Sequence, residues 1–186
     1  MPITTLDPKT ALIVIDLQKG IVGLPVAHPV APVIAHAASL AKAFRARNLP
    51  VVLVNVAGIA PGRTDAGPMS FELPPDWTEL VPELEHQPSD ILVTKQQWGA
   101  FYGTALDLSL RRRGVTQVVL VGVATSIGVE STARDAYERG YNVTLVVDAM
   151  TDMKKDAHDN SLQHIFPRLG ETGPTQAVLD LLAKSA

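Results

Sequence analysis

The chain has 186 residues, of which 46% are hydrophobic and 19% are charged, and its formal net charge at pH 7 is −3. This length and composition predict one folded domain over residues 1–186 with a substantial buried core. The negative charge argues against nucleic acid as a partner, because phosphate binding needs a basic surface. No apolar run reaches the length of a membrane span, and the first residues lack the pattern of a signal peptide, so we expect a cytoplasmic protein without a membrane partner. The chain contains no cysteine, which excludes disulfides, thiol catalysis and cysteine metal sites.

Short apolar runs rich in β-branched residues alternate with stretches of helical periodicity. Such runs are typical of strands buried on both faces of a parallel sheet. The predicted strands are Ala11–Ile15, Val51–Val56, Ile91–Val93, Val118–Val121 and Val143–Val147. The predicted helices are Val30–Arg47, Thr104–Arg113, Ile127–Arg139, Asp156–Phe166 and Pro174–Lys184. The alternation predicts an α/β fold of three layers with right-handed crossovers.

The longest segment without either pattern is 57–78, which is rich in glycine and proline. A loop of this length in a compact domain is usually a functional lid or an oligomer contact. The apolar segment Ile21–Val26 is a second candidate for either role.

An acidic residue ends the first predicted strand, in the sequence Asp16-Leu17-Gln18. In doubly wound sheets, ligands bind beyond the carboxyl ends of the strands. A carboxyl group that follows five apolar residues is half-buried, and the loss of hydration raises its pKa, so it can act as an acid or a base. The alternative is that Asp16 only caps a turn or the start of a helix.

A lysine ends the third predicted strand and precedes a cluster of aromatic residues. Lys95 follows the apolar run, and Trp98, Phe101 and Tyr102 come soon after it. This pattern indicates the wall of a pocket. The alternative is a surface lysine, with Trp98 and Phe101 packed in the core.

A helix is predicted to begin just after the fourth strand, in the sequence Ala124-Thr125-Ser126-Ile127-Gly128. The free backbone N–H groups of a helix N-terminus form a site for an anion or an oxyanion. Gly128 would let a substrate approach the backbone closely. The alternative, which is compatible with the first, is an ordinary cap by Thr125 or Ser126.

Together, these motifs resemble the isochorismatase-like superfamily of cysteine hydrolases. The resemblance is carried by ALIVIDLQ, TKQQWGAFYG, VGVATSIGVESTARD, VVDAM and HIFPRLG, and it covers nearly the whole chain. It implies a three-layer α/β/α fold with a mostly parallel six-stranded sheet of Rossmann-like topology. It also implies catalytic positions at Asp16, Lys95 and Gly128, a cis peptide bond between Val123 and Ala124, and a homo-oligomer.

Gly128 stands where the amidases of this family have their nucleophilic cysteine. The resemblance therefore implies a hydrolase that acts on a small-molecule substrate without a thiol. The isochorismatases proper also have glycine here, and they cleave a vinyl ether with release of pyruvate. By that resemblance, Asp16 protonates the enol ether, Lys95 holds Asp16 or a substrate carboxylate, and water attacks the oxocarbenium ion. Ser126 lies two residues from the nucleophile position, so we expect its side chain to point elsewhere.

Two departures from the isochorismatase pattern leave the substrate open. Gln97 and Trp98 stand where that pattern has arginine and tyrosine, and Thr125-Ser126 stands where it has histidine. A dianionic substrate calls for arginine, and the obvious replacement is Arg63 in the 57–78 loop. The expected substrate-binding residues are Gln18, Arg63, Trp98, Phe101, Ala124, Thr125 and Ser126.

No cofactor is expected. The nicotinamidases of the family bind a metal through Asp-x-His after the second strand, where this chain has Asn55-Val56-Ala57, and His158 and His164 are not spaced to share a helical face. No glycine-rich phosphate loop follows the first strand, so NAD is not expected either.

The alternative to an enzyme is a family member that has lost catalysis and serves as a small-molecule binding or scaffold protein. An open, polar pocket would favour the enzyme. A pocket filled by Trp98, Phe101 and Tyr102 would favour the binding protein.

Overall fold

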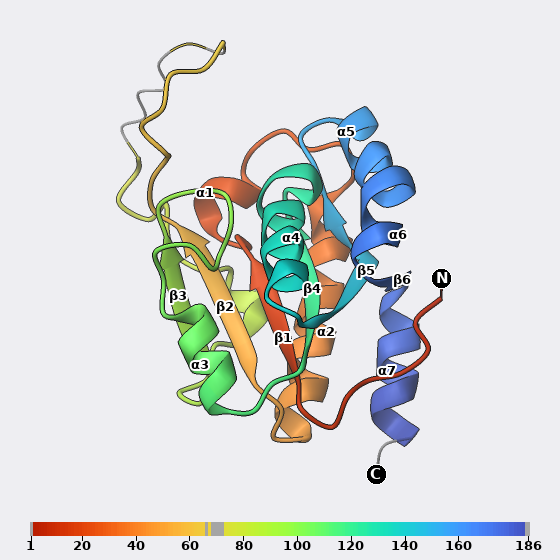
Figure 1. Cartoon of the computed structure of the whole chain (residues 1–186). Coiled ribbons are helices and arrows are strands. Elements are labelled where there is room, and N and C mark those ends of the chain that lie inside the picture. Colours follow the sequence, from red (N-terminus) through yellow and green to blue (C-terminus); the bar gives the residue numbers. More distant parts are fainter. Residues whose placement is uncertain (1, 66, 68–72, 185–186) are drawn as a thin grey trace.

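The computed structural model describes residues 2–65, 67 and 73–184 (Figure 1). Its centre is a six-stranded sheet in the order β3-β2-β1-β4-β5-β6, in which each strand runs parallel to its neighbours. The strands are β1 (Thr10–Ile15), β2 (Val51–Val56), β3 (Ile91–Lys95), β4 (Gln117–Val123), β5 (Asn142–Thr151) and β6 (Glu171–Gly173). The predicted α/β fold with a parallel six-stranded sheet is confirmed.

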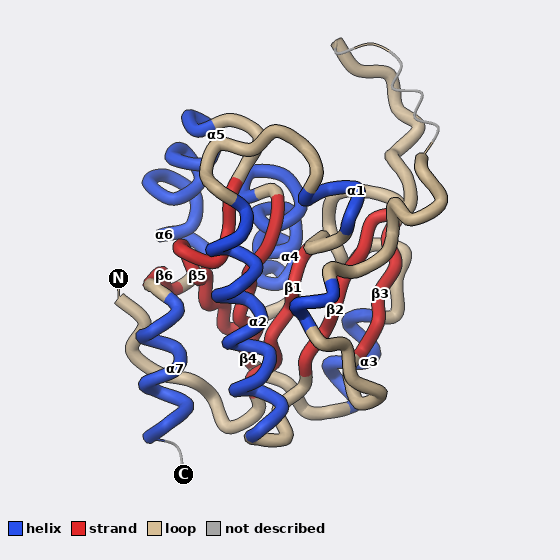
Figure 2. The backbone as a smooth tube through the Cα atoms, turned by 180° about the vertical axis from the view of Figure 1, so that it is seen from behind, coloured by secondary structure: helices blue, strands red, loops and turns tan. Residues whose placement is uncertain are grey.

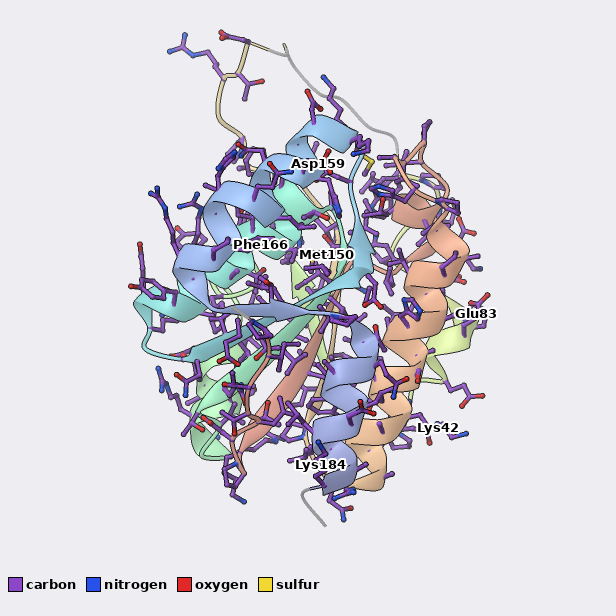
Figure 3. All side chains as sticks on the ribbon, turned by 90° about the vertical axis from the view of Figure 1, so that its right-hand side faces the viewer. Lys42, Glu83, Met150, Asp159, Phe166 and Lys184 are labelled. Carbon is purple, nitrogen blue, oxygen red and sulfur yellow. The ribbon has the colours of Figure 1, made fainter. Side chains whose placement is uncertain are left out.

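Helices cover both faces of this sheet. One face carries α2 (Val30–Ala46) and α7 (Thr175–Lys184), which lie side by side in Figure 3. The other face carries α3 (Leu106–Arg112), α4 (Glu130–Glu138) and α6 (Phe166–Leu169), and Figures 1 and 2 show the two layers in turn. The remaining helical pieces are α1 (Lys19–Val22), the 3₁₀ turn η1 (Pro82–Leu84), the π-helical turns η2 (Thr125–Val129) and η3 (Ser161–Ile165), and α5 (Lys155–Asn160).

The central strand β1 explains why the apolar runs are continuous. All of its residues are buried, and successive side chains of a strand point to opposite faces. Leu12 and Val14 belong to the core that α2 and α7 cover, whereas Ile13 and Ile15 belong to the core on the α3 and α4 side. A strand between two apolar layers therefore needs apolar residues at every position.

Several elements differ from their predictions. The helix predicted over Ile127–Arg139 is divided between η2 and α4, and the one predicted over Asp156–Phe166 is divided between α5 and η3. Strand β6 and helix α1 were not predicted, because β6 is a three-residue edge strand of half-buried residues and α1 is a single turn without buried residues. Neither has the apolar pattern on which the predictions depend.

The strand order places a crevice between β1 and β4. The chain leaves β1 for α2 on one face of the sheet and leaves β4 for α4 on the other. At such a reversal the two connections separate, and the carboxyl ends of the strands are left open to a ligand. Asp16 directly follows β1 and η2 closely follows β4, so both lie at this point.

Candidate active site

A cavity of about 200 Å³ lies at the carboxyl ends of the central strands. It is smaller than the roughly 300 Å³ at which typical ligand pockets begin, which suits a small molecule. Asp16, Lys95 and Gly128 all line it. The structure thus brings together three residues that are 112 positions apart in the sequence at their extremes, because β1, β3 and β4 all end at this edge.

Asp16 and Lys95 form a buried ion pair. The Lys95 ammonium donates to Asp16 Oδ2 over 2.7 Å and to the carbonyl oxygen of Gln97 over 3.1 Å. Both residues are almost fully buried. The other carboxylate oxygen, Asp16 Oδ1, is buried without a hydrogen-bond partner among the described residues. Only one oxygen of the carboxyl group is therefore held by a neighbouring side chain.

Burial changes the acidity of Asp16. Removal from water raises its pKa from 3.8 to about 6, although the charge and the hydrogen bond of Lys95 act in the opposite direction. A carboxyl group with this pKa is protonated in a substantial fraction of molecules just below neutral pH and can donate its proton. The backbone of Asp16 is also unusual, with a φ of 52°, a left-handed conformation that aspartate tolerates better than most residues.

Gly128 leaves no room for a side chain without a rearrangement. A Cβ atom at this position would lie 2.9 Å from Ile15 Cγ2 and 3.2 Å from Asp16 Oδ2. Ile15 is the last residue of β1, and its side chain is fully buried in the core on the α3 and α4 side of the sheet. The backbone at Gly128 is thus packed closely against Ile15 and Asp16.

The turn η2 that carries Gly128 is anchored by side chains that point away from the cavity. Asp152 Oδ2 accepts hydrogen bonds from the backbone N–H of Ser126 over 2.6 Å and from its hydroxyl over 2.8 Å. Thr125 Oγ1 forms a 2.8 Å hydrogen bond with His158 Nδ1. The expectation that Thr125 or Ser126 caps the helix is wrong, because η2 begins after Ala124 and has no side-chain cap. The peptide bond between Val123 and Ala124 is cis, as the resemblance implies.

Gln18 is buried and is not one of the residues that line the cavity. Its side-chain amide donates to the carbonyl oxygens of Val56 and Trp77, and its Oε1 accepts from the N–H of Val56. The indole N–H of Trp77 donates to the same carbonyl oxygen of Val56 over 2.9 Å. Gln18 therefore joins the ends of β1 and β2 to the segment that carries Trp77.

The other predicted substrate-binding residues do not all line the cavity. Trp98 and Ala124 line the cavity, whereas Phe101 is buried in the core beneath α3 and α4. Arg63 lines a second hollow, formed by residues 57–64 and Gly67 together with Leu73 and Trp98. Figure 1 shows that the 57–65 part of this segment extends away from the body of the protein. The predicted lid or contact region at 66 and 68–72 lies outside the described residues.

Sequence reasoning missed two residues that matter here. Asp152 follows β5 as Asp16 follows β1, so the same strand-end argument would have found it. Trp77 lies in the irregular 57–78 segment, where no periodic pattern marks its role. Among the residues described, no three acidic or histidine side chains converge on a metal site, and no helix is long and apolar enough to span a membrane.

Comparison with known proteins agrees with this architecture. The isochorismatase domain model matches residues 10–177. The chain is 47% identical over 180 residues to the isochorismatase family protein YwoC of Bacillus subtilis, covering 92% of this chain and 93% of that protein. The structure of an isochorismatase family protein from Burkholderia thailandensis superposes with a TM-score of 0.92 at 48% identity, over 96% of this chain and 98% of that one.

A more distant solved structure extends the comparison to an amidase. N-carbamoylsarcosine amidase from Thermoplasma acidophilum superposes with a TM-score of 0.74 at 28% identity, over 90% of this chain and 96% of that one. The domain model matches most of the chain, and the alignment with YwoC covers nearly the whole length of both proteins. The chain belongs to the isochorismatase family of hydrolases.

Proposed function

We propose that the protein hydrolyses a small metabolite without a nucleophilic side chain, with Asp16 as the general acid. The observation that carries this proposal is that Asp16 lines the cavity and is buried, with one carboxyl oxygen, Oδ1, that has no hydrogen-bond partner among the described residues. None of the described residues lining that cavity is a serine, threonine, cysteine or tyrosine. An acid is therefore available beside the substrate, whereas a hydroxyl or thiol nucleophile is not.

The reaction that such a site supports best is cleavage of a vinyl ether. The protonated Asp16 transfers its proton to the terminal alkene carbon, which leaves an oxocarbenium ion. Water adds to the carbon that bears the oxygen and returns a proton to Asp16. The resulting hemiacetal or hemiketal collapses to a carbonyl compound and an alcohol. Water is the only co-reactant, and no covalent enzyme intermediate is needed.

Lys95 has a defined part in this cycle. Once Asp16 has given up its proton, its carboxylate lies 2.7 Å from a fixed ammonium group. A charge pair in a site sheltered from water stabilises the anion more strongly than the same pair in bulk water. Lys95 thus limits the rise in the pKa of Asp16 that burial causes, and it keeps the acid strong enough to donate.

The test is hydrolysis of two vinyl ethers by the wild type and by Asp16→Asn. Phenyl vinyl ether would yield acetaldehyde and phenol, and isochorismate would yield pyruvate. We expect at least one of them to be cleaved by the wild type. In Asp16→Asn the rate should fall by at least about 100-fold, because a positioned general acid contributes roughly 10²- to 10⁴-fold. Asp156→Asn, which changes an exposed aspartate of α5, is the matched control and should retain full activity.

Two results would contradict the proposal. One is cleavage that proceeds equally well in Asp16→Asn, because the acid would then lie elsewhere. The other is no cleavage of either ether above the rate in buffer, which would favour the alternative of a non-catalytic binding or scaffold protein.

A further inference from the structure

Apart from Asp16, Lys95 and Gln97, the described residues that line the cavity are mainly apolar. Ile21 and Leu24 contribute from the α1 region, and Val56 and Ile59 from the end of β2 and the segment after it. Val123 and Ile127 line the side formed by β4 and η2, with Met153 beyond β5. A ligand that enters this space loses its water and gains apolar contacts in return.

The charges in the cavity compensate one another. Asp16 and Lys95 are the only charged residues among the described lining, and they are paired over 2.7 Å. Gln97 is the remaining residue with a long polar side chain, but its amide nitrogen donates to the carbonyl oxygens of Gly99 and Tyr102. While Asp16 is ionised, its charge offsets that of Lys95, so no cation among the described lining residues is left to receive an anionic substrate group.

The two aromatic residues of the cavity reinforce this conclusion. The indole N–H of Trp77 is already engaged with the carbonyl oxygen of Val56, so Trp77 offers a ligand its ring rather than a donor. Trp98 lines the cavity with an uncharged indole ring. Arg63 lines the adjoining hollow instead of this cavity, so it lies outside the space next to Asp16.

We infer that the part of the substrate that enters the cavity beside Asp16 is uncharged and mainly apolar, and that it presents a single ether or carbonyl oxygen near the carboxyl group. This inference rests on the proposed function for the identity of the reacting group. It separates the substrate from a dicarboxylate of the isochorismate type, because a carboxylate buried without a partner carries a large desolvation penalty.

Binding of a matched neutral and anionic pair tests this inference directly. Benzamide and benzoate have nearly the same shape, and at pH 7.5 only benzoate is charged. The chain has two tryptophans, and both line the cavity, so their fluorescence reports on its occupation. We expect benzamide to change this fluorescence with a dissociation constant at least ~10-fold lower than that of benzoate, because only the anion must bury an unpaired charge.

Two leucine variants provide the control. Leu24→Arg places a cation at the cavity and should shift the preference toward benzoate. Leu108→Arg makes the same change at another exposed leucine, on α3 and outside the cavity lining, and should leave the preference unchanged.

The outcomes separate this inference from the proposed function. Binding needs no proton transfer, so a clear preference for benzamide would support the substrate class even if neither vinyl ether were cleaved. Equal or tighter binding of benzoate to the wild type would overturn the inference while leaving Asp16-dependent cleavage intact. A fluorescence signal that neither compound changes would also overturn it, because the cavity would then not accept a small neutral molecule.

Discussion

Asp16 combines three properties that single residues seldom share: a buried carboxyl group, a fixed ammonium partner and a left-handed backbone conformation. Sparsely populated backbone conformations cost roughly 1–3 kcal/mol and gather at functional sites. Here the conformation comes directly after a strand that is locked between β2 and β4. The surrounding sheet therefore holds the acid in a position that the isolated chain would disfavour.

Gly128 gives a prediction about stability. The change Gly128→Ala would press a methyl group against Ile15 Cγ2 and Asp16 Oδ2, and Ile15 has no space in which to move. We expect a loss of about 1–3 kcal/mol in the free energy of unfolding, as for other overpacked positions. Urea denaturation measures this loss.

Gly62 offers the control for that experiment, because a Cβ there would meet no atom within 4 Å. Gly62→Ala should change stability by no more than about 0.5 kcal/mol. A Gly128→Ala protein as stable as the wild type would show that the site has room for a side chain, and the packing argument would fail.

At the same scale, the sequence predicted the centre of the site better than its surroundings. Asp16, Lys95 and the segment with Gly128 were each expected near the carboxyl end of a predicted strand, and the family resemblance joined them as one site. The substrate-binding roles of neighbouring residues were predicted less well. Phe101 packs into the core, as the alternative to a pocket wall had it, and the Ser126 hydroxyl binds Asp152. The tertiary contact with Asp152 is not encoded in the sequence next to Ser126.

Among the elements, η2 depends most on a single distant residue. Asp152, at the end of β5, receives both the backbone N–H and the hydroxyl of Ser126, and the N–H of Lys154 as well. Asp152→Ala would leave these partly buried donors without their partner. A fully buried unsatisfied group costs about 1–3 kcal/mol, so we expect a loss of about 1–2 kcal/mol in the free energy of unfolding, together with lower activity.

Thermal and urea unfolding of this variant can be compared with Glu138→Ala, which removes an exposed carboxylate at the end of α4. That control should lie within about 0.5 kcal/mol of the wild type. If Asp152→Ala were as stable as the control, η2 would not depend on this anchor.

Elements with strong patterns were predicted well and short ones were not. Strand β2 was predicted with its observed bounds, Val51–Val56, because its apolar run stops where the sheet stops. The predicted helix over Ile127–Arg139 missed η2, because a π-helical turn has the same composition as an α-helix. The turn contains one more residue than an α-helical turn, because the N–H of Val129 donates a hydrogen bond to the carbonyl oxygen of Ala124, five residues earlier.

At the scale of the whole molecule, the site is a product of topology. The reversal of strand order between β1 and β4 opens the crevice, and Gln18 joins β1, β2 and the Trp77 segment around it.

The burial of Asp16 also makes the stability of the protein depend on pH. Because the pKa of Asp16 is higher in the folded protein than its usual 3.8, the folded state binds this proton more tightly than the unfolded chain, and the contribution of Asp16 to stability falls as the pH rises from about 4 to 6.

The most direct test of the central claim is the pH dependence of kcat/KM for a cleaved vinyl ether, after subtraction of the rate in buffer. This quantity reports the pKa of the acid in the free enzyme. Because Asp16 must be protonated and burial raises its pKa to about 6, we expect kcat/KM to be highest below that pH and to fall about tenfold for each further pH unit above it. A value of kcat/KM that stays constant or rises between pH 5 and 8 would contradict Asp16 as the acid.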